Sequence, residues 1–536
     1  MNRDPNPRHP LLAECTMMTT SAPQISGPYD LFKTLRKAMY TLPEGVVHGS
    51  DGAQVSYGEL LTLVERVQAV LPGHRGAGDE VIAICTAKTP ACVAAILATL
   101  ATGRAYAPLD PSHPETRLIG ILDDLRPTAL IVDETTRVKL EIWARRAQVR
   151  LIDLERLPPH RLAFDIPAYT GQELAAVLHT SGSTGKPKRV EICAPAIHAF
   201  QDWVADEMSI MIDDCLISHA PFAFDLSFLD IFVSLMSGSG LALCDAKCAR
   251  NGARILALLD EAQVTVWHSA PSALKLLAEI GGGQTLPQMR CVLFAGEPMP
   301  ARTLHKLFEI FPNAHFVNIY GCTETNDTFF YSVPRVGTPE HLPLGRKLPY
   351  VEYHIVDGDL RPMDGVCEGE LWVRCPTMMR GYSDPALTRE VMITCDGKDY
   401  YRTGDYVRRD EAGLIHFVGR RDAMIKLNGV RVDLNEVDRA LQSHPNIDDA
   451  TCFVTDTDDG KQLNAWISSK DAKLNSLDIR LHLNKLLPVA ALPKRYIISV
   501  SALPKNSNGK ACRRNLAQLA AAGPVRAADA DLTPTS

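Results

Sequence analysis

The segment HTSGSTGKPKRV, residues 179–190, is the most informative stretch of the chain, and it directly follows the apolar run Leu174–Leu178. Its small and hydroxylated residues allow backbone N–H groups and Ser and Thr hydroxyls to surround phosphate oxygens, while Lys186 and Lys188 supply positive charge. The segment therefore predicts a nucleotide-phosphate loop that follows a buried strand.

A Walker-type P-loop is the first alternative for this segment, and the spacing of the glycines excludes it. A P-loop has four residues between its glycines, whereas Gly182 and Gly185 enclose only two. Lys186 is followed by Pro187, which lacks the N–H that the helix of a P-loop would present at this point. A flexible Gly/Ser linker is the second alternative, and the composition of the loop alone does not exclude it.

From about residue 55 to residue 360, β-branched apolar runs alternate with amphipathic stretches, which predicts βα units around a mostly parallel sheet. We expect strands at Val81–Cys85, Ala129–Val132, Val264–His268 and Val292–Phe294. We expect helices at Tyr57–Val70, Ala91–Ala101 and Pro271–Ile280. This part of the chain is therefore predicted to be α/β.

The pattern changes near residue 350, where short alternating segments separated by Gly and Asp predict an antiparallel β subdomain. These segments are VEYHIVD (351–357), GELWVRC (369–375), DYYRTGDYVRRD (399–410) and GLIHFVGRRD (413–422). A smaller α+β unit follows, with helices expected at Leu434–Ser443 and Leu477–Leu487 and strands at Thr451–Val454 and Asn464–Ser468. We expect a disordered leader (1–29), an N-terminal core (30–421), a C-terminal domain (422–518) and a disordered tail (519–536).

Composition narrows the class of protein. The chain has 536 residues, 46% of them apolar, and its 56 Lys and Arg against 63 Asp and Glu give a net charge of −7. Mild acidity without a basic block argues against a nucleic-acid partner, and no apolar run approaches the roughly 20 residues of a membrane span. The 14 cysteines are scattered without a CxxC pair. We therefore expect a cytoplasmic protein with reduced thiols that binds neither nucleic acid nor membrane.

The loop TSGSTGKPK resembles the phosphate loop of the adenylate-forming superfamily, which includes acyl-CoA synthetases, luciferases and amino-acid adenylation domains. Other segments resemble motifs of that family, in the family's order: SYGEL (56–60), YAPLDPSHPETR (106–117), FAFDLSFLDIF (222–232), NIYGCTET (318–325), GEL (369–371), YRTGD (401–405), FVGRRDAMIKLNGVRVDLNEVD (417–438) and LPKNSNGKACR (503–513). The resemblance covers about residues 30–518 and argues against a mere linker. It implies a large α/β domain with parallel sheets, followed by a small mobile α+β domain.

The resemblance further implies that the protein binds ATP and Mg²⁺. The nucleotide-binding residues would be Thr180, Ser181, Gly182, Ser183, Thr184, Gly185, Lys188, Gly296, Asn318, Tyr320, Thr323, Asp405, Arg420 and Lys510. Among them, Tyr320 would lie beside the adenine, Asp405 would accept hydrogen bonds from the ribose, and Arg420 would lie near the ribose and phosphate. Glu324 would bind Mg²⁺. Taken alone, Glu324 also fits a surface acid and Asp405 a turn former.

Three of the implied residues, Lys510, Thr180 and Glu324, would be catalytic. Lys510 would bridge the substrate carboxylate and the α-phosphate, a role that suits a compact ammonium. Asp422 matches the family's hinge, so rotation of the small domain would replace Lys510 by the KLNGVR loop in the same active site. For Lys510 alone, a solvated surface lysine is the plain alternative.

The residues aligned with the family's acid-binding pocket indicate which acid is activated. Family members that activate α-amino acids carry an Asp that pairs with the substrate ammonium, and here that residue is Asp225, although a helix N-cap is an alternative role for it. The remaining pocket positions are Leu226, Leu229, His268, Leu293, Ala295, Ile319, Asp327 and Thr328. His268 and Asp327 disfavour a wholly apolar side chain, because they would be left unpaired. We expect a small or medium amino acid with a hydroxyl or amine, or a proline analogue.

After Lys510 only 26 residues remain, too few for a carrier domain. The leading hypothesis is therefore a stand-alone, AMP-forming amino acid–carrier-protein ligase of natural-product biosynthesis, which passes its acyl group to the phosphopantetheine thiol of a separate carrier protein. An aryl- or acyl-CoA ligase and a catalytically inert partner subunit that retains the fold are the alternatives. We expect a monomer or a weak dimer.

Overall fold

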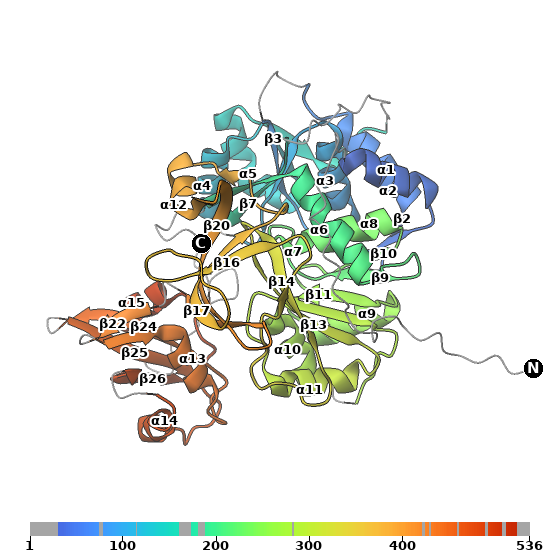
Figure 1. The fold of residues 1–536 in the computed structure, drawn as a ribbon. Coiled ribbons are helices and arrows are strands. Elements are labelled where there is room, and N and C mark those ends of the chain that lie inside the picture. The colour runs from blue at the N-terminus through green and yellow to red at the C-terminus, as the bar shows by residue number, and fades with distance from the viewer. Residues whose placement is uncertain are drawn as a thin grey trace, which may run out of the picture.

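The computed structural model describes residues 31–73, 79–113, 115–159, 173–180, 188–280, 283–420, 424–427, 430–457, 460–487, 491–505 and 511–521. Figure 1 shows a large body, coloured blue through yellow to orange, with the last part of the chain, in dark orange to red, beside it. The leader and the tail expected at 1–29 and 519–536 fall wholly or mostly outside these residues. The predicted domain boundary at Arg421 and Asp422 also falls outside them.

A seven-stranded sheet forms one half of the body. Its strands run in the order β18 (Gly381–Tyr382), β8 (Lys188–Cys193), β7 (Leu174–Thr180), β4 (Ala105–Pro108), β3 (Val81–Cys85), β5 (Ala129–Val132) and β6 (Arg150–Asp153). The parallel strands β3, β4 and β5 are almost wholly buried, which explains why they read as unbroken apolar runs in the sequence. Helices α4 (Glu115–Leu125) and α5 (Glu134–Ala147) cover one face.

A nine-stranded sheet forms the other half of the body. Its order is β15 (Arg346–Lys347), β14 (Asn326–Val333), β13 (His315–Cys322), β12 (Cys291–Ala295), β11 (Val266–Ser269), β9 (Cys215–Ser218), β10 (Gly240–Leu243), β1 (Val46–His48) and β2 (Gln54–Ser56). Helices α9 (Gly252–Glu261), α10 (Pro271–Ile280) and α11 (Ala301–Ile310) cover one face and share a core with Trp267, Val292 and Phe316.

Several helices lie between the two sheets and join them. They are α1 (Leu31–Thr41), α2 (Tyr57–Gln68), α3 (Pro90–Ala101), α6 (Ala194–Glu207), α7 (Leu226–Phe228) and α8 (Ser234–Ser237), and one core cluster contains residues of both sheets and of these helices. Helix α2 begins with a capping box, in which the Glu59 carboxylate accepts a hydrogen bond from the backbone N–H of Ser56 (2.8 Å). A π-helical turn, Leu229–Val233, connects α7 and α8. No helix in the described residues is both long and apolar enough to cross a membrane.

An antiparallel sheet follows, as the alternating segments predicted. It contains β16 (Glu352–Val356), β17 (Cys367–Arg374), β20 (Lys398–Arg409) and β19 (Met392–Cys395), with β21 (Ile415–Arg420) paired to β20, and α12 (Pro385–Val391) precedes β19. Leu371, Val373 and Val407 of this sheet share a core cluster with Leu293 and Ile319 of the nine-stranded sheet. The β subdomain therefore packs on the face of that sheet opposite α9–α11.

The C-terminal part has its own core. It contains β22 (Met424–Leu427) paired with β23 (Val430–Asp433), the three-stranded sheet β24 (Asp449–Thr457), β25 (Gly460–Ser468) and β26 (Arg495–Ser499), and helices α13 (Leu434–Gln442), α14 (Ser476–Leu483) and α15 (Arg513–Ala521). Valines and leucines of α13, β25 and α14 pack together in that core. This α+β composition confirms the predicted fold class.

The expected elements are present, with shifted ends. Helix Pro271–Ile280 is found as predicted, whereas the helix expected at Leu477–Leu487 already ends at Leu483, because Asn484 follows as the cap and residues 484–486 form a turn. The strand expected at Val264–His268 is found at Val266–Ser269, and the backbone N–H of Val264 instead bonds to the Leu259 carbonyl at the end of α9.

Candidate active site

The predicted phosphate loop connects two antiparallel strands. In β7 and β8, Thr180 pairs directly with Lys188, so the two residues that flank the loop lie next to each other. Ser181, Gly182, Ser183, Thr184 and Gly185 lie outside the described residues. The Lys188 ammonium lies 5.2 Å from the centroid of the Tyr382 ring, a cation–π contact that holds the end of the loop against β18.

Glu324 is held by the same tyrosine. The Tyr382 hydroxyl donates a 2.6 Å hydrogen bond to Glu324 Oε1, and both side chains are buried. The backbone N–H of Met379 donates to the Glu324 carbonyl (2.8 Å), which fixes the main chain at this point. Tyr382 therefore joins the loop residue Lys188 to the carboxylate of Glu324.

Tyr382 is a site residue that the sequence analysis missed. It stands in a two-residue strand and contacts a glutamate 58 positions earlier in the chain. No spacing rule connects such positions. A Gly-Tyr pair, Gly381 and Tyr382, is the only local signal in the sequence, and it is far too common to indicate a site.

Tyr320 and Asp405 form a second buried pair. The Tyr320 hydroxyl donates to Asp405 Oδ2, and burial, followed by the charge of Asp405, raises the pKa of Tyr320 far above its usual range. Asp405 lies in β20 opposite Arg420 of β21, so the backbones of these two predicted nucleotide-binding residues are adjacent. The Asn318 amide donates to the Pro343 carbonyl (2.8 Å) and has a structural contact of its own. Gly296, just after β12, adopts a positive φ of 90° that few other residues tolerate.

Asp225 has the capping role considered for it, and its surroundings bear on its charge. It is the N-cap of α7, since its carboxylate accepts a hydrogen bond from the Leu226 N–H (3.1 Å). Burial, followed by the charge of Glu324, raises the pKa of Asp225 to about 6, and a hydrogen bond from the Thr323 hydroxyl opposes this shift. Asp225, Thr323 and Glu324 therefore lie together, although they come from two distant segments.

One face of the nine-stranded sheet carries the predicted pocket wall. His268 pairs with Leu293 across β11 and β12, and Ala295 pairs with Ile319 across β12 and β13. Parallel neighbours in register point to the same face, and residues two apart on a strand share that face. Leu229 of the π-helical turn packs in the same core cluster as Leu293, Ala295 and Ile319.

His268 lies at a buried position on this wall. The side chain is 2% exposed, and neither ring nitrogen has a hydrogen-bond partner among the described residues. Burial lowers the pKa of His268 to about 4, and the backbone of Leu226 opposes part of that shift. The imidazole is therefore neutral at pH 7.

Asp327 and Thr328 stand at the start of β14 and differ in their contacts. Asp327 is buried, and its Oδ2 atom has no hydrogen-bond partner among the described residues. The Thr328 hydroxyl, in contrast, donates to the Tyr320 carbonyl (3.1 Å). A Cβ atom on Gly321 would lie 2.0 Å from the Asn326 carbonyl oxygen, so only glycine permits this close turn between β13 and β14.

Some of the predicted residues cannot be placed. Lys510 and the hinge residue Asp422 lie outside the described residues, and for Arg420 only the backbone is described. Lys505 and Ala511, which flank the segment of Lys510, form an antiparallel bridge. In the described residues, no group of three or more His, Cys, Asp or Glu side chains is arranged to hold a metal ion.

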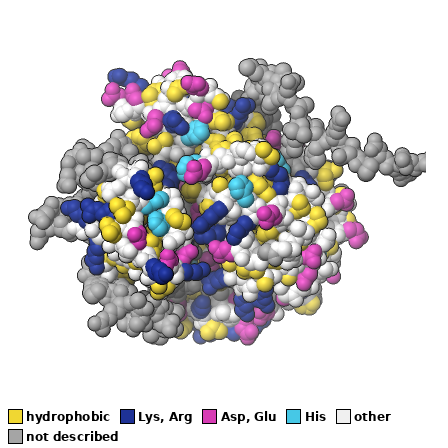
Figure 2. All heavy atoms as spheres, turned by 90° about the horizontal axis from the view of Figure 1, so that it is seen from below, with side chains coloured by type: hydrophobic (Ala, Val, Ile, Leu, Met, Phe, Trp, Pro, Cys, Tyr) yellow, Lys and Arg dark blue, Asp and Glu magenta, His cyan; other side chains and the backbone are white. Residues whose placement is uncertain are grey.

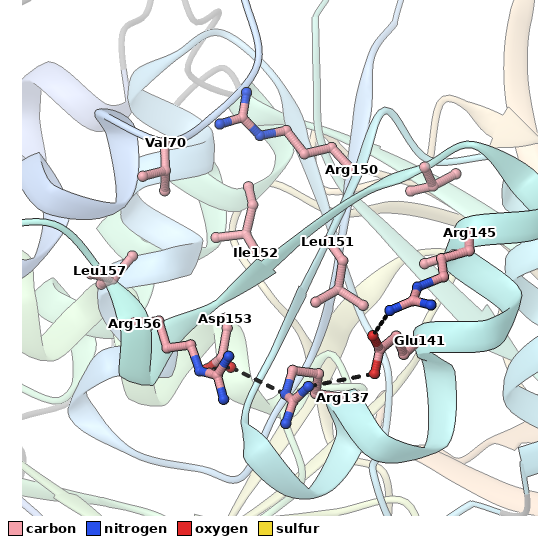
Figure 3. Close-up of a pocket in the computed structure, with 12 residues that line it drawn as sticks. Val70, Arg137, Glu141, Arg145, Arg150, Leu151, Ile152, Asp153, Arg156 and Leu157 are labelled. Carbon is pink, nitrogen blue, oxygen red and sulfur yellow. Dashed lines mark hydrogen bonds and ion pairs between the residues drawn. The ribbon is translucent and has the colours of Figure 1, made fainter.

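A cavity of about 530 Å³ lies elsewhere, between α5 and β6 (Figure 3). Three of the four arginines that line it form ion pairs: Arg137 contacts both Glu141 (3.4 Å) and Asp153 (3.4 Å), Arg145 pairs with Glu141 (2.5 Å), and Arg156 pairs with Asp153 (3.3 Å). None of the predicted site residues lines this cavity.

Figure 2 shows the surface of the molecule seen from below, where Lys and Arg side chains gather toward the middle of the face.

Comparison with known proteins identifies the family. Residues 35–383 match the AMP-binding enzyme family, and residues 436–510 match the AMP-binding enzyme C-terminal domain. The chain is 31% identical over 500 residues to an L-proline–[L-prolyl-carrier protein] ligase of Streptomyces coelicolor, covering 87% of this chain and 92% of the relative. It is 26% identical over 503 residues to a D-alanine–D-alanyl carrier protein ligase of Bacillus licheniformis, and the match covers 91% of this chain and 98% of the relative.

Other matches are longer proteins or solved structures. A dimodular nonribosomal peptide synthase of Bacillus subtilis is 28% identical over 516 residues, and the chain spans about a fifth (21%) of its length. A holo four-domain nonribosomal peptide synthetase bound to AMP and glycine superimposes with a TM-score of 0.78 at 25% identity, over 91% of this chain and 36% of that one. ATP-bound MatB from Rhodopseudomonas palustris superimposes with a TM-score of 0.80 at 23% identity, over 92% of this chain and 98% of that one. This match supports the fold alone. With both of its family domains matched, the chain belongs to the AMP-binding enzymes of the adenylate-forming superfamily.

Proposed function

We propose that this enzyme activates an amino acid with ATP and transfers it to the phosphopantetheine thiol of a separate carrier protein. The observation that carries the proposal is Asp225, a carboxylate beside Thr323 and Glu324. The predicted pocket residues Leu229, Leu293 and Ile319 are buried together in one core cluster. Burial and a neighbouring carboxylate both disfavour the ionised form of a carboxyl group. Pairing with an ammonium group stabilises that ionised form. The two carrier-protein ligases among the relatives support the same function.

In the first half-reaction, the substrate carboxylate attacks the α-phosphorus of ATP, the bond to the β-phosphate oxygen breaks, and pyrophosphate leaves. The protein then has to position the reactants and stabilise developing negative charge. Thr180, Lys188 and the loop between them would hold the phosphates, Tyr320 and Asp405 would bind the nucleoside, and Lys510 would neutralise charge at the reacting groups. In the second half-reaction, the thiol attacks the acyl carbon and AMP leaves.

The residues present fit Mg²⁺, which would neutralise phosphate charge when bound. Glu324 offers a hard carboxylate oxygen, the type of ligand that Mg²⁺ takes, next to the loop strand that would bring the phosphates. Its buried position close to Asp225 also favours a nearby cation, because two carboxylates raise each other's proton affinity. Tyr382 orients this carboxylate by its hydrogen bond.

We further propose that the C-terminal domain, 422–518, turns about Asp422 between the two half-reactions. Lys510 belongs to that domain, so closure would bring it to the phosphates for adenylation, and rotation would present the KLNGVR loop for thiolation. In Lys510→Ala the first half-reaction should fall at least about a hundredfold, as typically follows the loss of a charge-stabilising group.

The test is amino-acid-dependent exchange of radiolabelled pyrophosphate into ATP, measured with a panel of α-amino acids, aryl acids and fatty acids. We expect exchange with α-amino acids only, and loss of it in Lys510→Ala. Mass spectrometry of a holo carrier domain, compared with free coenzyme A, then identifies the acceptor. Exchange with aryl or fatty acids and transfer to coenzyme A would identify a CoA ligase, and absence of any exchange would indicate a non-catalytic subunit.

A further inference from the structure

A second carboxylate, Asp327, lies close enough to Asp225 for their charges to interact. Its backbone is fixed on both sides, since its N–H donates to Asn326 Oδ1 (2.7 Å) and its carbonyl accepts from the Tyr350 hydroxyl (3.4 Å). Asp327 also pairs with Gly321 at the end of β13. These contacts leave the side chain little freedom to turn toward solvent, and it is only 7% exposed.

The position of Asp327 on its strand directs the carboxylate to the pocket face. A β-bulge separates Asp327 from Phe329, and Asp327 pairs with Gly321, which is two residues from Ile319 on β13, so Asp327 and Ile319 share a face. Ile319 is buried in the core cluster that contains Leu229 and Leu293. Asp327 Oδ2 finds no hydrogen-bond partner there among the described residues. It is therefore an unsatisfied acceptor on the same face as the apolar pocket wall.

The two carboxylates interact with each other and lack a basic partner. After burial, the charge of Asp225 is the next cause that raises the pKa of Asp327, which reaches about 8. Within the described part of the chain, no Lys, Arg or His forms an ion pair with Asp225 or Asp327. A buried carboxyl that keeps its proton beside a second carboxylate can ionise when a cationic group pairs with it, so a ligand with two ammonium groups would satisfy both side chains.

We infer that the amino acid activated here is a diamino acid, whose α-ammonium pairs with Asp225 and whose side-chain ammonium pairs with Asp327. The inference rests on the proposed function and narrows its substrate class. The leucines Leu229 and Leu293 and the Ile319 side chain would contact the methylene groups between the two charges. An apolar side chain would leave Asp327 unpaired, and a hydroxyl would offer one donor without the charge.

Matched substrate pairs test this inference on the unmodified enzyme. L-ornithine and L-norvaline differ only in the terminal amine, as do L-2,4-diaminobutyrate and L-2-aminobutyrate. We expect kcat/KM in pyrophosphate exchange to be at least about 100-fold higher for one or both diamino acids than for the neutral partner, since each factor of ten corresponds to 1.36 kcal/mol. In Asp327→Asn, we expect this ratio to fall at least about tenfold.

The outcomes separate the two proposals. Exchange that is equal or greater with the neutral partners, or a ratio that Asp327→Asn does not change, overturns the diamino acid and leaves amino-acid activation intact. Absence of exchange with every amino acid overturns amino-acid activation itself, and the diamino acid with it. Asp225→Asn serves as the comparison, because it should reduce exchange with both members of each pair, whereas Asp327→Asn should act on the diamino member.

Discussion

The Tyr382 hydroxyl donates a 2.6 Å hydrogen bond to Glu324 Oε1, and the Lys188 ammonium lies over the ring of the same tyrosine. This arrangement links the strand that leaves the phosphate loop to the carboxylate proposed to bind Mg²⁺. The two ends of the contact belong to different sheets, since Tyr382 is in the seven-stranded sheet and Glu324 follows β13 of the nine-stranded sheet. One hydrogen bond therefore connects the two halves of the body at the proposed active site.

Tyr382→Phe should weaken ATP use more than it weakens the fold. A hydrogen bond to a charged group contributes about 1.5–3 kcal/mol, so we expect kcat/KM for ATP to fall about 10- to 100-fold in pyrophosphate exchange. Tyr331→Phe is the matched control. Tyr331 packs against the core cluster between the nine-stranded sheet and α9–α11, and its hydroxyl has no hydrogen bond to a described residue. Equal effects of the two substitutions would contradict a positioning role for Tyr382.

Asp225→Asn separates the capping role from the counter-ion role. Asparagine caps helices about as well as aspartate, so the melting temperature should change little. It carries no charge, however, and a hydrogen-bonded charge pair lost at a binding site costs about 2–5 kcal/mol. We expect kcat/KM for the amino acid to fall at least about 30-fold. Retention of full activity would show that Asp225 acts only as the N-cap of α7.

Asp327 makes a prediction about stability and pH in the absence of substrate. Its native pKa, about 8, lies above the ordinary value of 3.8, so the native state keeps a proton that the unfolded state releases between these values. The free energy of unfolding should therefore decrease as pH rises from about 4 to 8. Asp327→Asn should remove this contribution and stabilise the empty protein at pH 8 by at least about 1 kcal/mol.

Urea unfolding at pH 5.5 and pH 8 measures the effect, with the wild type and Asp327→Asn compared at each pH. The difference between the two proteins should be larger at pH 8. A variant that is less stable than the wild type at pH 8 would show that the Asp327 carboxylate has a stabilising partner in the native state.

Lys88 supports the segment that carries the pocket. Its ammonium donates to the Ser218 carbonyl (3.0 Å) and hydroxyl (3.2 Å), and the charge of the fully buried Asp230 opposes the lowering of the Lys88 pKa by burial. Asp230 lies in the π-helical turn next to Leu229. Lys88→Met would leave the Asp230 carboxylate uncompensated, which costs about 3–5 kcal/mol in the free energy of unfolding.

Lys139→Met provides the control for that substitution, because among the described residues Lys139 donates only to the Pro111 carbonyl (3.1 Å). Its loss should lower the free energy of unfolding by about 1 kcal/mol. Adding Asp230→Asn to Lys88→Met should restore part of the stability, since it removes the unpaired charge. If the double variant is no more stable than Lys88→Met, the charge of Asp230 is not the reason for the loss.

Much of the fold could be predicted from the sequence, because burial leaves a direct signal. Strand β3 is buried on both faces and reads VIAIC, and helix α10 has apolar positions at helical spacing. The order of strands in the two large sheets has no such signal. It depends on contacts between residues far apart in the chain, such as the pairing of Tyr382 with Val190.

The candidate site was predictable for similar reasons only in part. Glu324, Asp225 and Asp405 stand in motifs that resemble those of the family, and the structure places Asp225 beside Glu324. The contact between Tyr382 and Glu324 and the unpaired Oδ2 atom of Asp327 could not be predicted, since both depend on three-dimensional packing. Lys510 and Asp422 remain predictions.

The central claim is that the enzyme activates an α-amino acid whose ammonium group pairs with Asp225. The most direct test compares pyrophosphate exchange for the best amino acid of the panel with exchange for the same acid lacking its α-amine. We predict a kcat/KM at least about 100-fold higher for the amino acid, and loss of most of this preference in Asp225→Asn. Equal exchange with the two acids, or exchange supported by aryl acids alone, would contradict the account.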